Sequence, residues 1–188
     1  KSSKTSPFQP LTYIDIIYSY KPNRKLQILN KADFLEYWPK IIDDLHKISL
    51  SMAILELTDK TISENDSHPE LFSILIKLFQ SYNDKTSDPN LLFWFYECAL
   101  LTHLGFRPSL QKNDLPGLHL PDPNSGPNSG VILASLLSGD IKNLPSDSIT
   151  KVDRKIISDY LWMSLCYHFE NLYKAKSIKI AKKLLVSM

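Results

Sequence analysis

Cysteine, histidine and paired acidic residues are the side chains that could carry catalysis or hold a metal in this chain, and their spacing supports neither role. Cys98 and His103 are five residues apart and Cys166 and His168 are two apart, so neither pair shares a helix face. Two cysteines also fall short of the about four N or S ligands of a structural zinc site. Nucleotide-binding, nucleophile-elbow, zincin and paired CxxC motifs do not occur. We therefore expect no enzymatic activity, no metal and no cofactor.

The adjacent carboxylates Asp43 and Asp44 invite an acid–base interpretation. They precede a helical pattern, however, and acidic side chains in the first turn of a helix are stabilised by the helix dipole. We expect that structural role for both residues.

Aromatic and cationic residues near the N-terminus have the composition of a surface that binds single-stranded nucleic acid. Tyr18 and Tyr20 are followed closely by Lys21, Arg24 and Lys25. Such surfaces combine aromatic side chains that stack on bases with cations that follow the phosphate backbone. The alternative interpretation is that these cations are ordinary solvated side chains.

The charge distribution is more informative than the net charge of +2. Residues 1–31 hold six cations and one acid, residues 171–188 hold five lysines and no acid, and the stretch between them is net negative by eight charges. Two basic ends thus flank an acidic body. This asymmetry indicates a local electrostatic footprint for a polyanion.

The elements that must position these residues begin with a predicted β-hairpin. Residues 11–20 are β-branched and aromatic, residues 21–24 carry a Pro-Asn turn signal, and residues 25–30 form a second short strand. Because an isolated hairpin is marginal in water, we expect these strands to belong to a larger sheet, a small barrel. No later segment supplies partner strands, so the earlier strands of that sheet are expected outside the printed sequence.

From residue 33 onward the pattern turns helical. Residues 39–62 predict one helix of some twenty residues, with apolar positions three, four or seven apart. Residues 67–70 have capping-box spacing ahead of a second helix. Asp88-Pro89 predicts the start of a third helix, and Gly105 its end. The interior of that third helix, LLFWFYECALLTHL, is apolar nearly all round, so we expect it at the centre of a helical bundle.

Four consecutive aromatic residues, Phe93 to Tyr96, lie within this central helix. With no neighbouring cation, the run is more typical of a core than of a surface that stacks on bases. Trp94 and Tyr96 nevertheless exceed what one buried helix face requires. Apolar surface around this helix for a protein partner therefore remains an open interpretation.

The C-terminal half begins with an interruption. Residues 112–130 contain four prolines and three glycines, which predicts a loop or a mobile linker. A short helix is predicted at residues 131–137. Thr150 and Asp153 have the spacing of a helix cap.

Two further helices are predicted after this cap. The first covers residues 156–170, and the last covers residues 178–186 with its lysines on the outer side. The inward face of the first is expected at Ile156, Tyr160, Met163 and Tyr167.

Composition places the chain among ordinary globular proteins. It has 188 residues, of which 43% are hydrophobic and 22% are charged. No apolar run approaches the ~18 residues of a membrane-spanning helix, and the printed sequence does not open with a positively charged segment followed by an apolar stretch. We expect a protein of the reducing cytoplasm that does not bind membranes.

Several motifs, in order, resemble the RecO family of bacterial recombination mediators. The segment FYECALLTHLGFRP, centred on residues 99–106, resembles the family's "L-L-x-x-L-G-[YF]-x-P". Residues 8–11, FQPL, resemble the "L-Q-P-[FL]" that precedes the last strands of its barrel. Four other segments follow the family's order: residues 26–29, the helix from Pro39, the helix from Pro69, and residues 168–177. The resemblance therefore covers nearly the whole chain.

This resemblance implies a mainly α fold: residues 1–32 as the C-terminal part of an OB-fold barrel, and residues 33–188 as a helical domain. The chain departs from the family in three respects. Most of the barrel is missing from the printed sequence, which explains the lone hairpin. Where a four-cysteine zinc module often follows, the sequence is Gln111-Lys-Asn-Asp, so zinc is not expected. Basic residues at the start of the central helix are replaced by Phe93-Trp94-Phe95, which argues for weak binding of an anionic peptide there.

The resemblance further implies a non-enzymatic DNA repair mediator. Such a protein binds and anneals single-stranded DNA, and acts with RecR and single-strand-binding protein to load recombinase. Trp94 and Tyr96 are the expected contacts for the acidic, hydrophobic tail of single-strand-binding protein. The alternative is a helical protein–protein adaptor with no nucleic-acid role. The expected DNA-binding residues are Lys1, Lys4, Tyr18, Tyr20, Lys21, Arg24, Lys25, Lys174 and Lys176.

Overall fold

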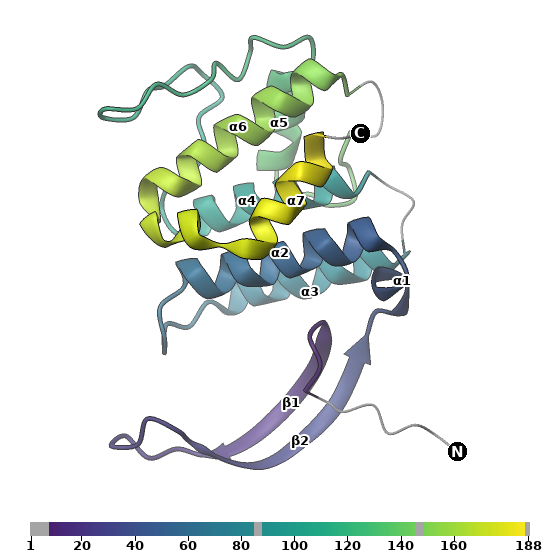
Figure 1. Cartoon of the computed structure of the whole chain (residues 1–188), viewed down its shortest axis with the longest axis vertical. Coiled ribbons are helices and arrows are strands. Elements are labelled where there is room, and N and C mark those ends of the chain that lie inside the picture. The colour runs from purple at the N-terminus through teal and green to yellow at the C-terminus, as the bar shows by residue number, and fades with distance from the viewer. Residues whose placement is uncertain (1–7, 85–87, 146–148, 187–188) are drawn as a thin grey trace. The chain divides into compact units, whose positions relative to one another are not determined.

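The computed structural model describes residues 8–84, 88–145 and 149–186. The chain divides into two compact units, residues 1–39 and residues 40–188 (Figure 1). Each unit is described by itself below.

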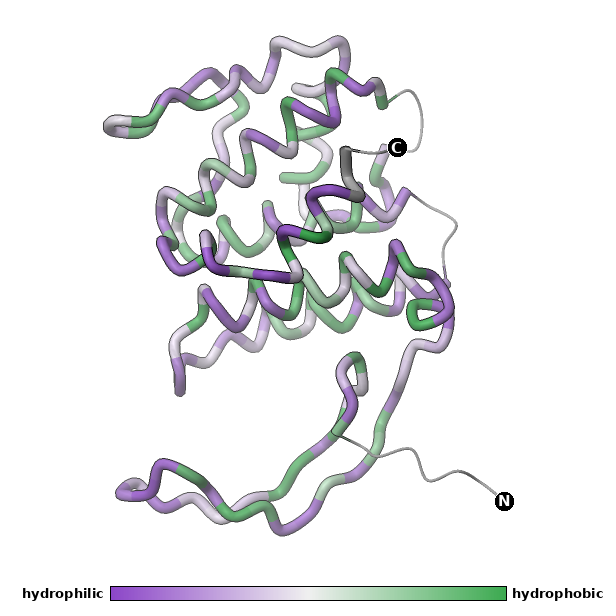
Figure 2. The backbone as a smooth tube through the Cα atoms, viewed as in Figure 1, coloured by the Kyte–Doolittle hydropathy of each residue, from purple (hydrophilic) through white to green (hydrophobic). Residues whose placement is uncertain are grey.

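The first unit is a β-hairpin. Strand β1 (Thr12–Ser19) pairs antiparallel with β2 (Ile28–Tyr37), and the register shifts twice, leaving Asn30 and Leu35 as extra residues on β2. Bulges of this kind bend a strand and increase its twist. Figure 2 shows hydrophobic residues along both strands.

The second strand is longer than the sequence predicts. It begins at Ile28 and continues to Tyr37, so the expectation that the helical pattern begins at residue 33 is wrong. Residues 32–37, ADFLEY, contain good helix formers. Pairing with β1 overrides that local preference, because Ile14 opposes Phe34 and Thr12 opposes Tyr37 in the ladder.

The second unit is helical, which confirms the mainly α fold with a preceding hairpin. No helix of the described residues is long and apolar enough to cross a membrane. Its α-helices, labelled in Figure 1, are α1 (Pro39–Ile42), α2 (Leu45–Thr61), α3 (Pro69–Asp84), α4 (Pro89–His103), α5 (Ser129–Leu137), α6 (Lys151–His168) and α7 (Lys176–Val186). A short 3-10 helix, η1 (Glu170–Lys174), joins α6 to α7.

The single long helix predicted over residues 39–62 is in fact two helices. Asp44 has an extended backbone, and its carboxylate accepts hydrogen bonds from the N–H groups of His46 and Lys47 at 2.9 and 3.0 Å. An aspartate that caps the following helix in this way competes with continuation of the preceding one. Asp44 is therefore the N-cap of α2, and Asp43 precedes that cap.

Helix α4 is the core of the second unit, as its apolar sequence predicts. Residues Leu91 to Cys98 are all buried, and α4 packs against α2, α3, α5 and α6. Asp88 caps its N-terminus ahead of Pro89. At the other end, Gly105 has a φ of 86°, and Phe106 N–H donates to the Leu101 carbonyl at 2.7 Å, which is the Schellman motif that a C-terminal glycine permits.

The predicted loop at residues 112–130 extends to Asn128, since α5 begins at Ser129. Its later part is held in place by hydrogen bonds. Asn128 N–H donates to the Asp153 carboxylate at 2.8 Å, and the Ser129 hydroxyl donates to the Pro123 carbonyl. Asp153 also forms the predicted capping box with Thr150 at the start of α6.

Two details of the last helices differ from expectation. The inward face of α6 is Ile157, Tyr160, Leu161 and Leu165, whereas Tyr167 is 38% exposed. Helix α7 begins at Lys176, two residues early, because Glu56 accepts hydrogen bonds from the N–H groups of Lys176 and Ser177.

The lysines of α7 are not all on its outer side. The ammonium group of Lys182 lies 4.2 Å from the centre of the Trp162 ring. Burial lowers the pKa of Lys182, and the nearby Glu97 opposes that shift.

Candidate nucleic-acid interface

The turn of the hairpin brings together the cations and tyrosines that the sequence singled out. Arg24 N–H donates to the Lys21 carbonyl at 3.1 Å, which closes a tight turn between the strands. Lys21, Arg24 and Lys25 are all exposed. Tyr18 and Tyr20, at the end of β1 and just beyond it, are 50% and 64% exposed. Stacking on bases requires such accessible rings.

Gln27 fixes the conformation of this turn, and sequence reasoning did not identify it. Its side-chain carbonyl accepts from Lys21 N–H at 2.7 Å, and its amide nitrogen donates to the carbonyls of Lys21 and Arg24 at 3.1 and 2.9 Å. One side chain thus binds both ends of the turn. Glutamine is not among the residues that signal turns, so composition gave no indication of this role.

The positive charge of the hairpin is concentrated at the turn. No acid occurs between Tyr20 and Asn30. Farther along the strands Asp15 and Asp33 lie opposite each other, and Lys31 forms an ion pair with Asp33. Hydrogen bonding and charge attraction from Asp33 raise the pKa of Lys31. Lys31 is thus neutralised locally, and the uncompensated cations are those of the turn.

The remaining DNA-binding candidates lie elsewhere. Lys1 and Lys4 are outside the described residues. Lys174 and Lys176 are exposed residues of the helical unit, and they line an open cleft of about 700 Å³ together with Lys60 and Asn171. Two acids share that cleft: Glu56, which holds the N-terminus of α7, and Asp59, which pairs with Lys60 at 3.1 Å.

The two residues expected to bind a protein partner are core residues, so that expectation is corrected. Trp94 and Tyr96 are both 0% exposed. The indole N–H of Trp94 donates to the Ser158 hydroxyl at 3.1 Å, and the Tyr96 hydroxyl lies 2.5 Å from that of Thr58. Burial raises the pKa of Tyr96 to about 12. These contacts join α4 to α6 and α2, and they leave no surface for a partner at either ring.

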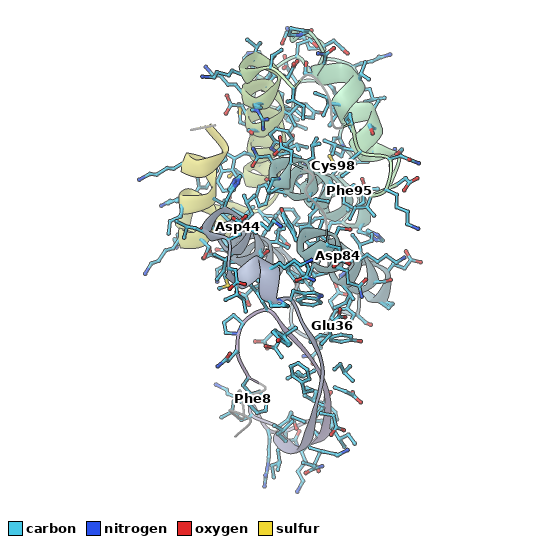
Figure 3. All side chains as sticks on the ribbon, turned by 90° about the vertical axis from the view of Figure 1, so that its right-hand side faces the viewer. Phe8, Glu36, Asp44, Asp84, Phe95 and Cys98 are labelled. Carbon is cyan, nitrogen blue, oxygen red and sulfur yellow. The ribbon has the colours of Figure 1, made fainter. Side chains whose placement is uncertain are left out.

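A small pocket borders a different flank of α4. Phe95, Cys98 and His103 contribute to a pocket of about 210 Å³ that also contains Arg107 and Leu136. Figure 3 shows Phe95 and Cys98 within the helical unit. One nitrogen of the Arg107 guanidinium donates to the Leu137 carbonyl at 3.0 Å, and a guanidinium has five N–H donors in all. The pocket thus has apolar walls with a cation beside them.

Neither cysteine is placed for chemistry. Both are buried, and burial raises the pKa of the Cys98 thiol well above its usual value and that of Cys166 to about 11. Reactive cysteines have lowered pKa values, so these two are structural. Among the residues that the structure describes, no group of three His, Cys, Asp or Glu side chains is close enough to hold a metal ion.

The fold and this interface define a helical protein that carries a basic, aromatic β-hairpin, and comparison with known proteins agrees with that class. The family model described as "Recombination protein O C terminal" matches residues 42–139. That match covers α2, α3, α4 and α5 in full, together with the loop before α5. The chain belongs to the RecO family.

Curated relatives support the same assignment. The DNA repair protein RecO of Christiangramia forsetii is 28% identical over 196 aligned residues, which cover 96% of this chain and 80% of that protein. The RecO proteins of Salinibacter ruber and Exiguobacterium sibiricum are 25% and 32% identical, over 60% and 52% of this chain. The matches span 43% and 39% of those two relatives.

Proposed function

We propose that this protein acts in DNA repair as a non-enzymatic recombination mediator that binds single-stranded DNA through its hairpin. The observation that carries the proposal is the turn itself: three exposed cations without an acid, held by Gln27 beside two exposed tyrosines. Membership of a family whose curated members are named DNA repair proteins supports it.

We also propose that the hairpin belongs to an OB-fold barrel. Large apolar side chains are exposed on both strands, and two strands alone do not make a stable sheet. OB-folds bind single strands on a sheet surface, with cations for the backbone and aromatic rings for bases. Such a surface can promote annealing of complementary strands if it binds two strands without sequence specificity.

The test is a titration of the whole chain with a fluorescent single-stranded oligonucleotide at several salt concentrations. If Lys21, Arg24 and Lys25 each neutralise one phosphate, the slope of log affinity against log salt is about −2, because each contact contributes about −0.7. Affinity then falls roughly 20-fold between 50 and 200 mM salt. Reversing all three cations to glutamate flattens the slope and weakens binding.

A matched control is available in the helical unit. Reversing Lys151 and Lys155, two exposed lysines of α6, together with exposed Lys77 of α3, changes the net charge equally but leaves the hairpin intact. If both triple variants lose affinity for the oligonucleotide equally, binding depends on the net charge of the protein and not on the position of the cations in the hairpin. If DNA binding by the whole chain is unmeasurable at low salt, a protein–protein adaptor explains the chain better.

Cooperation with RecR and with single-strand-binding protein completes the proposal. The pocket beside Arg107 suits an acidic peptide with an apolar end, which is the chemistry expected of the tail of single-strand-binding protein. Calorimetry with a synthetic tail peptide tests this, and Arg107→Ala should weaken binding. Loss of affinity in that variant with an unchanged thermal midpoint supports the pocket, and unchanged affinity excludes it.

A further inference from the structure

An apolar groove lies between α2 and α7 in the helical unit, beside Lys176. Ile48, Met52 and Ile180 line it together with Ser49 and Ser177, and its volume is about 290 Å³. The two helices pack against each other along this line (Figure 1). Ile180 is 57% exposed, and Leu45, one turn before Ser49 on α2, is 77% exposed. Aliphatic side chains in such positions favour burial against another apolar surface.

The side of this groove formed by α7 is basic. Helix α7 contains no acid. Lys176 and Lys183 lie four residues before and three residues after Ile180, so their side chains flank it on the same helix face. Lys179 and Lys183 are exposed, as is Lys176.

The acids of the neighbouring helix offset this charge only in part, because Glu56 is one negative charge beside the start of α7 and α7 holds four lysines. Helix α2 has two acids, Glu56 and Asp59. Glu56 accepts hydrogen bonds from the N–H groups of Lys176 and Ser177, and Asp59 pairs with Lys60. Burial acts to raise the pKa of Glu56, but its hydrogen bonds from the start of α7 outweigh that effect and lower it. The groove is therefore apolar along its floor and positive along one edge.

We propose that this groove binds an amphipathic helix of a partner protein that carries acidic residues along one flank. A helix in a groove buries apolar residues spaced three and four apart, and the spacing of Leu45, Ile48 and Met52 offers such a row. The acidic flank of the partner helix then lies against the lysines of α7. None of the five residues that line the groove is aromatic, so it does not offer the stacking that single-stranded DNA requires.

The test uses a fluorescently labelled synthetic helical peptide of about five turns, with leucines along one face and glutamates along one edge, and the whole chain. A second peptide has lysine in place of each glutamate. The glutamate peptide should bind, with an affinity that falls as salt rises, and the lysine peptide should bind much more weakly. Equal binding of the two peptides overturns the assigned charge of the partner.

Variants locate the binding site. Ile180→Ser should weaken peptide binding about tenfold or more, since burial of one such side chain accounts for a change of that size. The double reversal of Lys176 and Lys183 to glutamate should abolish the preference for the acidic peptide. Matched controls on α6 are Val152→Ser, which is 53% exposed, and reversal of Lys151 and Lys155.

Other occupants give different results. If the chain self-associates in sedimentation experiments and Ile180→Ser makes it monomeric, the groove is an interface between two copies and the proposal fails. If Ile180→Ser weakens binding of single-stranded DNA as much as binding of the peptide, the groove is part of the nucleic-acid surface and the proposal fails. Unchanged DNA binding with lost peptide binding supports it, and this outcome does not depend on the hairpin.

Discussion

Replacing Gln27 with alanine removes the side chain that holds the turn of the hairpin but leaves every charge in place. Three hydrogen bonds are lost, to the N–H and carbonyl of Lys21 and to the carbonyl of Arg24. The backbone groups that they satisfied are exposed and regain water. The turn therefore becomes more mobile without losing the strands on either side.

The size of the effect follows from these bonds. A typical hydrogen bond contributes about 0.5–1.5 kcal/mol net, and exposed ones belong at the lower end. Three of them give about 1.5 kcal/mol, which is the free energy needed to order the turn again when DNA binds. Since about 1.4 kcal/mol is a factor of ten, Gln27→Ala should weaken binding of single-stranded DNA up to roughly tenfold.

The salt dependence distinguishes this effect from a loss of charge. In fluorescence anisotropy at several salt concentrations, Gln27→Ala should shift the line of log affinity against log salt downward without changing its slope. Asn30→Ala is the control, because Asn30 donates to the Ser19 hydroxyl at 2.8 Å, outside the turn. If Gln27→Ala has the affinity of the natural chain, or if its slope flattens, the turn is not preorganised by this residue.

Three other predictions concern the helical unit. Asp153→Ala should lower the free energy of unfolding by about 2–4 kcal/mol in urea titrations, because its buried carboxylate accepts from Thr150 and from Asn128 N–H. Burial raises the pKa of Glu97, and Lys182 opposes this shift, so the folded state holds the proton more tightly than the unfolded state. Stability should therefore fall as pH rises above the unfolded pKa of about 4.5, and Glu97→Gln should flatten that dependence in thermal melts across pH 5–9. Elemental analysis of protein purified without chelator should find no stoichiometric zinc, and one zinc per chain would contradict this.

Much of the fold was predictable where the signal was local. As predicted, α4 begins at Asp88-Pro89 and ends before Gly105, and the Thr150–Asp153 capping box lies at the start of α6. These signals depend on a few adjacent residues. The split between α1 and α2 was missed because Asp44 is equally compatible with a first-turn position and with an N-cap, and only its extended backbone distinguishes the two.

Features that depend on distant contacts were not predictable. The helical pattern was expected to begin at residue 33, but β1 provides the partner that makes residues 33–37 part of a strand. The inward face of α6 was misplaced by one residue, since Ile156 and Ile157 are equally apolar in sequence and only packing against α4 and α5 selects Ile157. In the central aromatic run, Trp94 and Tyr96 find hydroxyl partners on α6 and α2, which sequence spacing does not reveal.

The two surfaces proposed here are both basic, so charge alone does not separate their ligands. The uncharged residues of each surface distinguish the two ligands. Tyr18 and Tyr20 offer flat aromatic faces beside the cations of the turn, whereas Ile48, Met52 and Ile180 offer only aliphatic surface beside the lysines of α7. Stacking on a tyrosine contributes about 1–3 kcal/mol per base with little salt dependence, and burial of an aliphatic side chain is similarly insensitive to salt. At high salt, where phosphate and carboxylate contacts are both screened, residual DNA binding should therefore require the tyrosines, and residual peptide binding should require Ile180.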